Sequence, residues 1–258
     1  MGNTLNNKKI AILVGGMYRE FDDAHKSWNF LNYDNSDFYI STWDKTYEVN
    51  RRLSTNIFED VTEDRIRNHI PNANIKISVD LNIENGQSSY IRKLIYHWKT
   101  LITMVNNSAK KYNIAILTRP DFFIKENVNL IDFIDTINYN KVYSLNNICV
   151  LPNYPFIYTN DCFFIANFSH IEKMINYLEP ISEYYDIHVY LSKYFIENKI
   201  DVESISPNII EYYVFRSIHR KTQNLGFYDN KQIGIEWWDI KNQEQVSNEL
   251  VEKIKKYV

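Results

Sequence analysis

The chain has few cysteines, little net charge and no long apolar run, and each shortage excludes a class of protein. Its two cysteines, Cys149 and Cys162, lack the spacing of a zinc site or a redox pair, and we expect two free thiols in a reducing compartment. The net charge of −3 among 258 residues gives no electrostatic reason to expect a nucleic-acid partner. The sequence therefore favours neither a disulfide-rich secreted fold nor a nucleic-acid-binding protein.

The apolar segments are also too short to enter a membrane. No run of 18 apolar residues occurs, and the polar residues 1–9 lead into an apolar strand without the apolar core of a signal peptide. We therefore expect no membrane span and a location in the cytoplasm.

What the chain does have is apolar material arranged as alternating strands and helices. Hydrophobic residues make up 45% of it, which is enough for a large core. Apolar runs at 9–14, 37–42 and 114–117 predict buried strands, and 74–79 alternates as a half-exposed strand does. Helical spacing predicts helices at 21–31, 63–70 and 88–111. This strand–helix alternation is typical of an α/β fold with a mostly parallel sheet and crossover helices.

The second half is less regular. Strands are predicted at 141–145 and 161–166, and helices at 169–178, 182–198 and 246–257. No repeat, linker or break in composition marks a boundary, so we expect residues 1–258 to form a single domain.

The most informative segment follows the strand 114–117. It ends on Thr118-Arg119-Pro120-Asp121, and the carboxyl ends of strands are where open α/β sheets bind ligands. Arg119 can fork onto a phosphate or carboxylate, and Asp121 can hold a divalent cation or a sugar hydroxyl. We expect little packing to depend on either residue. The alternative is an Arg–Asp pair on the surface at a strand end.

Two glycines end the first predicted strand. The segment Gly15-Gly16-Met17-Tyr18-Arg19 is neither a dinucleotide fingerprint nor a P-loop. It can still let a base or ribose approach the backbone of Gly15 and Gly16, with Arg19 near a diphosphate. The alternative is a plain turn with a surface arginine.

The second predicted strand ends beside the first, on Thr42-Trp43-Asp44. An aromatic ring and a carboxylate suit stacking on a base and bonding to a ribose, although a core tryptophan and a helix-capping aspartate explain the pattern equally. At the opening of the long helix, Gln87 and Lys93 reach the same edge only if that end of the helix abuts it. A solvated helix face is the alternative.

Candidates for a proton acceptor lie further along the chain. Asp161 follows Asn160 just before a hydrophobic strand, where a carboxylate can take a proton from a hydroxyl, although Asn-Asp is also common in turns. His188 has a suitable ordinary pKa, but a lone histidine on a helix is more often structural.

Taken in order, these motifs resemble a known group of proteins. The matching segments are Lys-Ile-Ala-Ile-Leu-Val-Gly-Gly-x-x-Arg, Asp-Phe-Tyr-Ile-Ser-Thr-Trp-Asp, Gln-x-x-Tyr-x-x-x-Lys-Leu, Tyr-Asn-Ile-Ala-Ile-Leu-Thr-Arg-Pro-Asp and Asn-Asp-x-Phe-Phe-Ile-Ala. The pattern, over roughly residues 8 to 200, resembles glycosyltransferase-like proteins of phages, large viruses and bacterial polysaccharide clusters, similar to WavE-type lipopolysaccharide synthesis proteins.

The resemblance implies a GT-A glycosyltransferase fold, a Rossmann-type mixed sheet with a nucleotide-sugar across its carboxyl edge. The strand equivalent to 114–117 would then end in Asp-x-Asp, which binds Mn²⁺ or Mg²⁺ and through it the diphosphate. Here Arg119-Pro120-Asp121 stands in that place, and a permanent cation replaces one ligand. Either Arg119 neutralises the diphosphate and metal matters little, or Asp121 alone holds the ion as catalytic and metal-binding residue.

The function implied is transfer of a sugar from a nucleotide-sugar donor, of the UDP-sugar class, to a hydroxyl of a glycan or lipopolysaccharide-type acceptor. Residues 8–125 would be the nucleotide-binding half, and 126–258 the acceptor-side half with a C-terminal helical tail. The location would be the host cytoplasm for a viral protein. Two alternatives stay open: a sugar nucleotidyltransferase, of whose glycine-rich loop Gly15-Gly16-x-x-Arg19 is a poor copy, and a non-catalytic nucleotide- or glycan-binding module.

Overall fold

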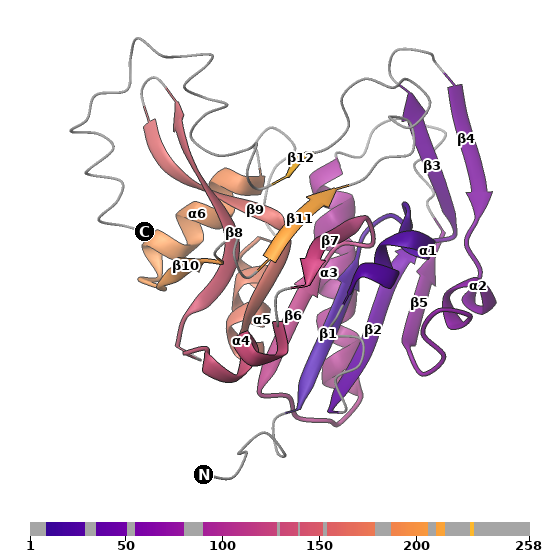
Figure 1. Cartoon of the computed structure of the whole chain (residues 1–258), viewed down its shortest axis with the longest axis horizontal. Helices are drawn as coiled ribbons and strands as arrows, with labels where there is room; N and C mark the ends of the chain where they lie inside the picture. Colours follow the sequence, from indigo (N-terminus) through magenta and orange to yellow (C-terminus); the bar gives the residue numbers. More distant parts are fainter. Residues whose placement is uncertain are drawn as a thin grey trace.

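One seven-stranded sheet runs through the molecule, with helices on both of its faces (Figure 1). The computed structural model describes residues 9–28, 35–50, 55–79, 90–127, 130–138, 140–151, 154–178, 187–205, 210–214 and 228–229, with the side chains of a smaller set. The expected α/β architecture, a mixed and mostly parallel sheet flanked by helices, is confirmed.

The elements follow one another along the chain, helices labelled α or η and strands β. They are β1 (Ile10–Gly15), α1 (Phe21–Ala24), η2 (His25–Ser27), β2 (Ser36–Trp43), β3 (Lys45–Asn50), β4 (Thr55–Asp60), α2 (Glu63–Arg67), β5 (Asn74–Ser78), α3 (Tyr90–Asn107), β6 (Ile114–Thr118), β7 (Phe122–Asn127), α4 (Leu130–Thr136), β8 (Val142–Leu151), β9 (Tyr154–Asn167), α5 (Phe168–Tyr177), α6 (Ile187–Glu197), β10 (Val202–Ser204), β11 (Ile210–Val214) and β12 (Tyr228–Asp229).

The strand order places a reversal at the middle of the main sheet. The order is β10-β8-β9-β6-β1-β2-β5. From β1 the chain moves outward through β2 to β5, then returns to the other side of β1 as β6, and all four of these strands are parallel. β9 is antiparallel to both of its neighbours, β6 and β8. The carboxyl ends of β1 and β6 are therefore adjacent at a topological switch point, where open α/β sheets bind their ligands.

Alternating side chains of β1 pack into two hydrophobic cores, one on each face of the sheet. Ile10, Ile12 and Val14 face the core beneath α1, α2, α4 and β7, while Ala11 and Leu13 face the core beneath α3, α5 and α6. Complete burial of β1 on both faces explains its continuous apolar run.

The strands predicted at 9–14, 37–42, 74–79 and 114–117 correspond to β1, β2, β5 and β6 with small shifts at their ends, whereas those predicted at 141–145 and 161–166 are parts of the longer strands β8 and β9. The helix predicted at 21–31 is wrong in extent, because α1 ends at Ala24 and Trp28 is already extended. The Ser27 hydroxyl accepts a hydrogen bond from the Ile124 amide at 2.9 Å, and the Trp28 indole donates to the Phe122 carbonyl at 2.6 Å. Docking against β7 therefore stops the helix.

Several elements were not predicted from the sequence. The hairpin of β3 and β4 lies beside β5 and projects beyond the carboxyl edge of the main sheet, as the outer part of β8 and β9 does on the opposite side (Figure 1). β7 pairs with β11 in a second, three-stranded sheet. The helix predicted at 246–257 lies outside the described residues, and the division into halves at residue 125 stays a prediction.

Within the described ranges, no helix is long and apolar enough to cross a membrane.

Candidate functional site

The candidate site lies at the carboxyl edge where β1, β2 and β6 end. The Gly16 amide donates to the Ser41 carbonyl at 3.1 Å, which ties the end of β1 to β2. Gly16 has a φ of +132°, a conformation that favours glycine, and a Cβ at this position would lie 3.5 Å from Pro120 Cδ. The Gly-Gly turn and the Arg-Pro-Asp segment, more than 100 residues apart, are thus neighbours at the switch point.

Gly15 has a packing reason to be glycine. An added Cβ would lie 2.9 Å from both Trp98 Cδ1 and Leu101 Cδ1 of α3, too close for any real side chain. Leu94, one turn earlier, lies 3.8 Å from the corresponding position on Gly16. The beginning of α3 therefore abuts this edge, which is the condition under which Lys93 could reach a ligand there. Lys93 itself is half-buried.

Arg119 lies between two aspartates at the centre of this edge. Its Nε donates to Asp121 Oδ1 at 2.9 Å and its Nη2 to Asp121 Oδ2 at 2.8 Å, a two-pronged ion pair. Its Nη1 donates to Asp161 Oδ1 and Oδ2 of β9 at 3.3 and 3.4 Å. The three side chains form what we call the Arg119 triad, one cation held by two carboxylates.

The triad is buried. Arg119 is 8% exposed, Asp121 2% and Asp161 5%. The prediction that little packing depends on Arg119 and Asp121 is therefore wrong, and so is the interpretation of the pair as a surface feature. Asp161 lies inside the long strand β9, so the alternative that it marks a turn is also wrong.

Cys162 completes the polar contacts of the triad. Its Sγ lies 3.4 Å from Asp161 Oδ1 and 3.7 Å from Arg119 Nη1. Burial raises the pKa of this thiol well above its ordinary value, and the neighbouring carboxylates reinforce the effect against the opposing guanidinium. The protonated thiol can therefore donate to Asp161, and Cys162 is a free cysteine as expected.

The triad does not fit the Mn²⁺ or Mg²⁺ ion that an Asp-x-Asp site would hold. Both oxygens of Asp121 already accept from Arg119, and both oxygens of Asp161 face the same guanidinium. Among the described residues, no group of three or more His, Cys, Asp or Glu side chains is placed to hold a metal ion. The Arg119 guanidinium contacts both carboxylates itself.

Two threonine hydroxyls at the same edge make no hydrogen bond within the part of the chain that the structure describes. Thr42 of β2 and Thr118 of β6 are buried, and neither Oγ1 makes a hydrogen bond in the described structure. Val14 of β1 is paired with Thr118 of β6 and with Ile40 of β2, which lies two residues before Thr42. The side chains of Thr42 and Thr118 therefore lie on the same face of the sheet as that of Val14. Buried polar groups are almost always hydrogen-bonded, and unsatisfied ones occur at sites that receive water or a ligand.

Trp43 and Asp44 are less well placed to receive a ligand than the sequence indicates. The Trp43 ring stacks on Tyr96 with centroids 5.1 Å apart and meets His97 edge-on at 4.3 Å, so its faces are occupied on the α3 side of the sheet. The Asp44 backbone joins β5 to the entry of α2, accepting from the Val61 amide at 2.8 Å and donating to the Ser78 carbonyl at 2.9 Å. Thr62, not Asp44, caps α2.

One buried polar pair, on the α3 side of the sheet near this edge, was not predicted from the sequence. His97 of α3 is fully buried, and its Nδ1 lies 2.8 Å from Ser41 Oγ of β2. The position of His97 within the apolar stripe of the long helix is the signal that could have shown it.

The remaining candidates have mixed outcomes. Arg19 lies three residues after Gly16, half-buried, with its Nε 3.1 Å from Met17 Sδ. Gln87 lies outside the described residues. His188 belongs to α6, but its side chain is likewise outside the described part. The structure thus brings together Gly16, Arg119, Asp121 and Asp161.

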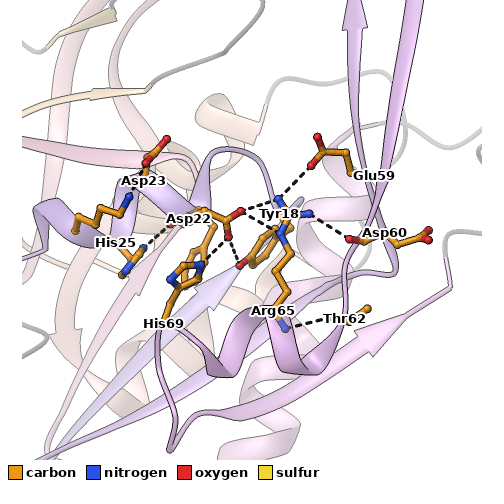
Figure 2. A network of polar contacts seen from close by, with 11 residues as sticks. Tyr18, Asp22, Asp23, His25, Glu59, Asp60, Thr62, Arg65 and His69 are labelled. Atoms are coloured by element: carbon orange, nitrogen blue, oxygen red, sulfur yellow. Dashed lines mark hydrogen bonds and ion pairs between the residues drawn. The ribbon is translucent and has the colours of Figure 1, made fainter.

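A second polar network lies nearby, centred on Asp22 of α1 (Figure 2). Asp22 accepts from the Tyr18 hydroxyl at 2.6 Å, from Arg65 Nη2 at 2.6 Å and from His69 Nε2 at 3.0 Å. Arg65 also contacts Glu59 at 3.1 Å and lies over the Tyr18 ring. The network joins the turn after β1 to α2.

Charge and burial act together in this Asp22 network. Burial opposes ionisation of Asp22, but hydrogen bonds from Arg65 and Tyr18 outweigh it and hold its pKa below the ordinary value. Burial and the hydrogen bond to Asp22 raise the pKa of Tyr18 far above its ordinary value, so the phenol stays protonated. Burial also lowers the pKa of His25, whose ring lies 4.3 Å from that of His69.

No family model matches this chain, and no curated protein matches its sequence. Among solved structures, the chain is similar to a Bacillus anthracis protein assigned as a glucose-1-phosphate thymidylyltransferase, in complex with a sucrose, with a TM-score of 0.48 and 9% identity over 88% of this chain and 100% of that one. It is also similar to the glycosyltransferase GlyE of Streptococcus pneumoniae, with a TM-score of 0.43 and 12% identity over 78% of this chain and 46% of that one.

These likenesses concern overall shape, and they bear on neither the activity nor the substrate of this chain. The resemblance of its motifs to WavE-type proteins stays a prediction.

Proposed function

We propose that the protein is a glycosyltransferase that moves a sugar from a nucleotide-sugar donor, of the UDP-sugar class, to a hydroxyl of a glycan acceptor. One observation carries the proposal. The Gly-Gly turn of β1 and the Arg119 triad meet at the switch point of the sheet, the place where an open α/β sheet receives a ligand. Both motifs also belong to the set that resembles glycosyltransferase-like proteins.

The charges at the edge indicate which residues bind the sugar of the donor and which bind its diphosphate. Two carboxylates and one guanidinium give the Arg119 triad a net negative charge, which repels a diphosphate but suits the hydroxyl donors of a sugar. We therefore assign the sugar to the triad. The diphosphate is assigned to the Gly16 backbone with Arg19 and Lys93, the cations that flank the turn and the start of α3.

Asp161 is the proposed proton acceptor for the acceptor hydroxyl. Its carboxylate comes from β9, the strand next to β6, and reaches the edge from the side opposite β1. Its carboxylate lies 3.3 Å from the Arg119 guanidinium, whose positive charge balances a carboxylate there without a metal. Asp121, with both oxygens on Arg119, fixes the guanidinium and through it the position of Asp161.

The proposal is tested by donor turnover with a panel of nucleotide-sugars, in the wild type and in Asp161→Asn. The amide keeps the shape of the side chain and removes its basicity, so the variant should bind UDP as the wild type does and lose at least about a hundredfold in sugar transfer. Transfer by Asp161→Asn at the wild-type rate would show that the proton acceptor lies elsewhere or that the reaction needs none.

The same assay separates the other two functions. Release of pyrophosphate from a sugar phosphate and a nucleoside triphosphate would identify a nucleotidyltransferase. Tight nucleotide binding with no turnover of any donor would identify a binding module. Thermal unfolding with UDP, compared between the wild type and Arg19→Ala, tests the phosphate end of the site separately. We expect weaker binding in the variant.

A further inference from the structure

The position of Arg119 between two carboxylates has a chemical consequence beyond the transfer reaction. We infer that Arg119 is the built-in cation of this site: it holds Asp121 and Asp161 where a divalent metal ion would hold them, so that the site takes its donor without a metal.

The geometry resembles the way a metal ion gathers carboxylates. One positive centre contacts four oxygens, two from strand β9 and two from the segment between β6 and β7, at 2.8 to 3.4 Å. Asp121 presents its carboxylate edge-on to the planar guanidinium, which matches that shape as a spherical ion does not.

Displacement of Arg119 by a metal ion would be costly. Arg119 is 8% exposed and has its charge partners inside the protein, so a metal ion that captured Asp121 would leave a buried guanidinium without its two-pronged partner. Removal of one member of a buried ion pair is strongly unfavourable. Burial makes the triad costly to form, and it also makes Arg119 hard to replace by a metal ion.

The assignment also gives Arg119 a different role from a phosphate ligand. Its Nε and Nη2 edge is directed at Asp121, and its Nη1 at Asp161. Arg119 is therefore a positioning residue. It holds the two carboxylates in place, and under the proposed function the sugar binds at these carboxylates while other cations of the edge meet the phosphate charge.

The first experiment uses Mn²⁺ alone and needs no donor, so its outcome is independent of the proposed function. The full chain, freed of metal with EDTA, is titrated with Mn²⁺ while free ion is followed by electron paramagnetic resonance. We expect no saturable binding in the wild type. We expect it in Arg119→Asp, which removes the guanidinium and restores a third carboxylate, with a rise in unfolding temperature of about 5 to 10 °C at roughly a hundred times the dissociation constant.

The matched control keeps the arginine and removes a carboxylate. If the wild type binds Mn²⁺ and Asp121→Asn abolishes that binding, Asp121 is a metal ligand and the inference is overturned. This comparison also decides the matter if Arg119→Asp does not fold, because neither protein in it lacks the arginine.

The second experiment rests on the proposed function and uses UDP as the probe. Its dissociation constant, measured by calorimetry in EDTA and in Mn²⁺, should agree within about twofold. A loss of tenfold or more in EDTA would contradict a built-in cation. If UDP does not bind under either condition, the proposed function fails, while the Mn²⁺ titration still decides the role of Arg119.

Discussion

The Arg119 triad and the Asp22 network use the same chemistry in different surroundings. In each, an arginine forks onto an aspartate and a further acidic residue joins the pair. The side chains of Arg119 and Asp121 are 9% and 3% exposed, whereas those of Arg65 and Asp22 are 30% and 35% exposed. The two networks therefore share an arginine held by two acidic residues and differ in how far solvent reaches that ion pair.

Solvation decides what each network can contribute. A half-exposed ion pair forms at little cost and stabilises by at most about 1 kcal/mol, which suits the attachment of α1 to α2. A buried triad carries a desolvation penalty that an apolar core of the same volume would avoid. The triad is therefore poorly explained as a stabilising device, and its place at the switch point supports the proposed role in binding.

The largest expected effect separates the two arginines. Arg119→Met should lower the free energy of unfolding by about 3 to 5 kcal/mol, because it removes the guanidinium that contacts the buried carboxylates of Asp121 and Asp161. Arg65→Met, the matched change in the Asp22 network, should lower it by about 1 kcal/mol, because water can solvate Asp22. Urea denaturation of both variants measures the difference, and equal losses would remove the distinction drawn between the networks.

A smaller effect is expected at the centre of the half-exposed network. Asp22→Asn should lower the free energy of unfolding by about 1 kcal/mol, since the amide keeps an acceptor for the Tyr18 hydroxyl but loses the charge that faces Arg65. Asp23→Asn serves as the control, because Asp23 makes an exposed pair with Lys26 and should matter less. The same urea measurement applies, and a loss above about 3 kcal/mol for Asp22→Asn would show that this network contributes to stability as much as a buried ion pair does.

Removal of the Thr118 hydroxyl tests ligand binding at the carboxyl edge of the main sheet without breaking an ion pair. Thr118→Val should leave the free energy of unfolding unchanged or higher, because the buried Oγ1 has no partner in the described structure, yet weaken UDP binding about fivefold if the donor bonds to it. Ser144→Ala in β8 is the control, since its Oγ is also buried without a partner. Calorimetry should show an effect at Thr118 only. Unchanged binding in Thr118→Val would remove this hydroxyl from the site.

The smallest effect concerns pH at His25, beside Asp22, Lys26 and His69. Burial lowers the pKa of His25 below its ordinary value of 6.5. Between the two pKa values the unfolded chain binds more protons than the folded one, so stability falls as the pH drops below about 6.5. From pH 7.5 to 5.5 the wild type should lose up to about 1 kcal/mol more than His25→Gln. Parallel curves for the two proteins would contradict a shifted His25.

Much of the fold could be predicted from the sequence, because fully buried strands leave a continuous apolar run. β1 and β6 are of this kind, and α3 shows its buried stripe at spacings of three and four. The β3–β4 hairpin could not be predicted in the same way. KTYEVN alternates over only two apolar residues, Tyr47 and Val49, and TNIFED does not alternate, so the signal is too short to predict a hairpin.

The candidate site was predicted residue by residue but not as an arrangement. The sequence identifies Arg119, Asp121 and Asp161 separately, because each stands at the edge of an apolar run. The contact of Asp161 with Arg119 depends on the antiparallel pairing of β6 with β9, which joins residues 42 positions apart and leaves no local trace. Burial of the triad is likewise a tertiary property, which is why the sequence left a surface Arg–Asp pair open as the alternative.

The central claim is that a nucleotide-sugar binds at the carboxyl edge between β1 and β6, and a crystal structure of the protein soaked with a UDP-sugar tests it most directly. With no metal added, we predict the diphosphate against Gly16 and Arg19, and the sugar over Asp121 and Asp161, with Arg119 still between the two carboxylates. A nucleotide bound away from the ends of β1 and β6, or bound there only through a metal ion that has displaced Arg119, would contradict the account.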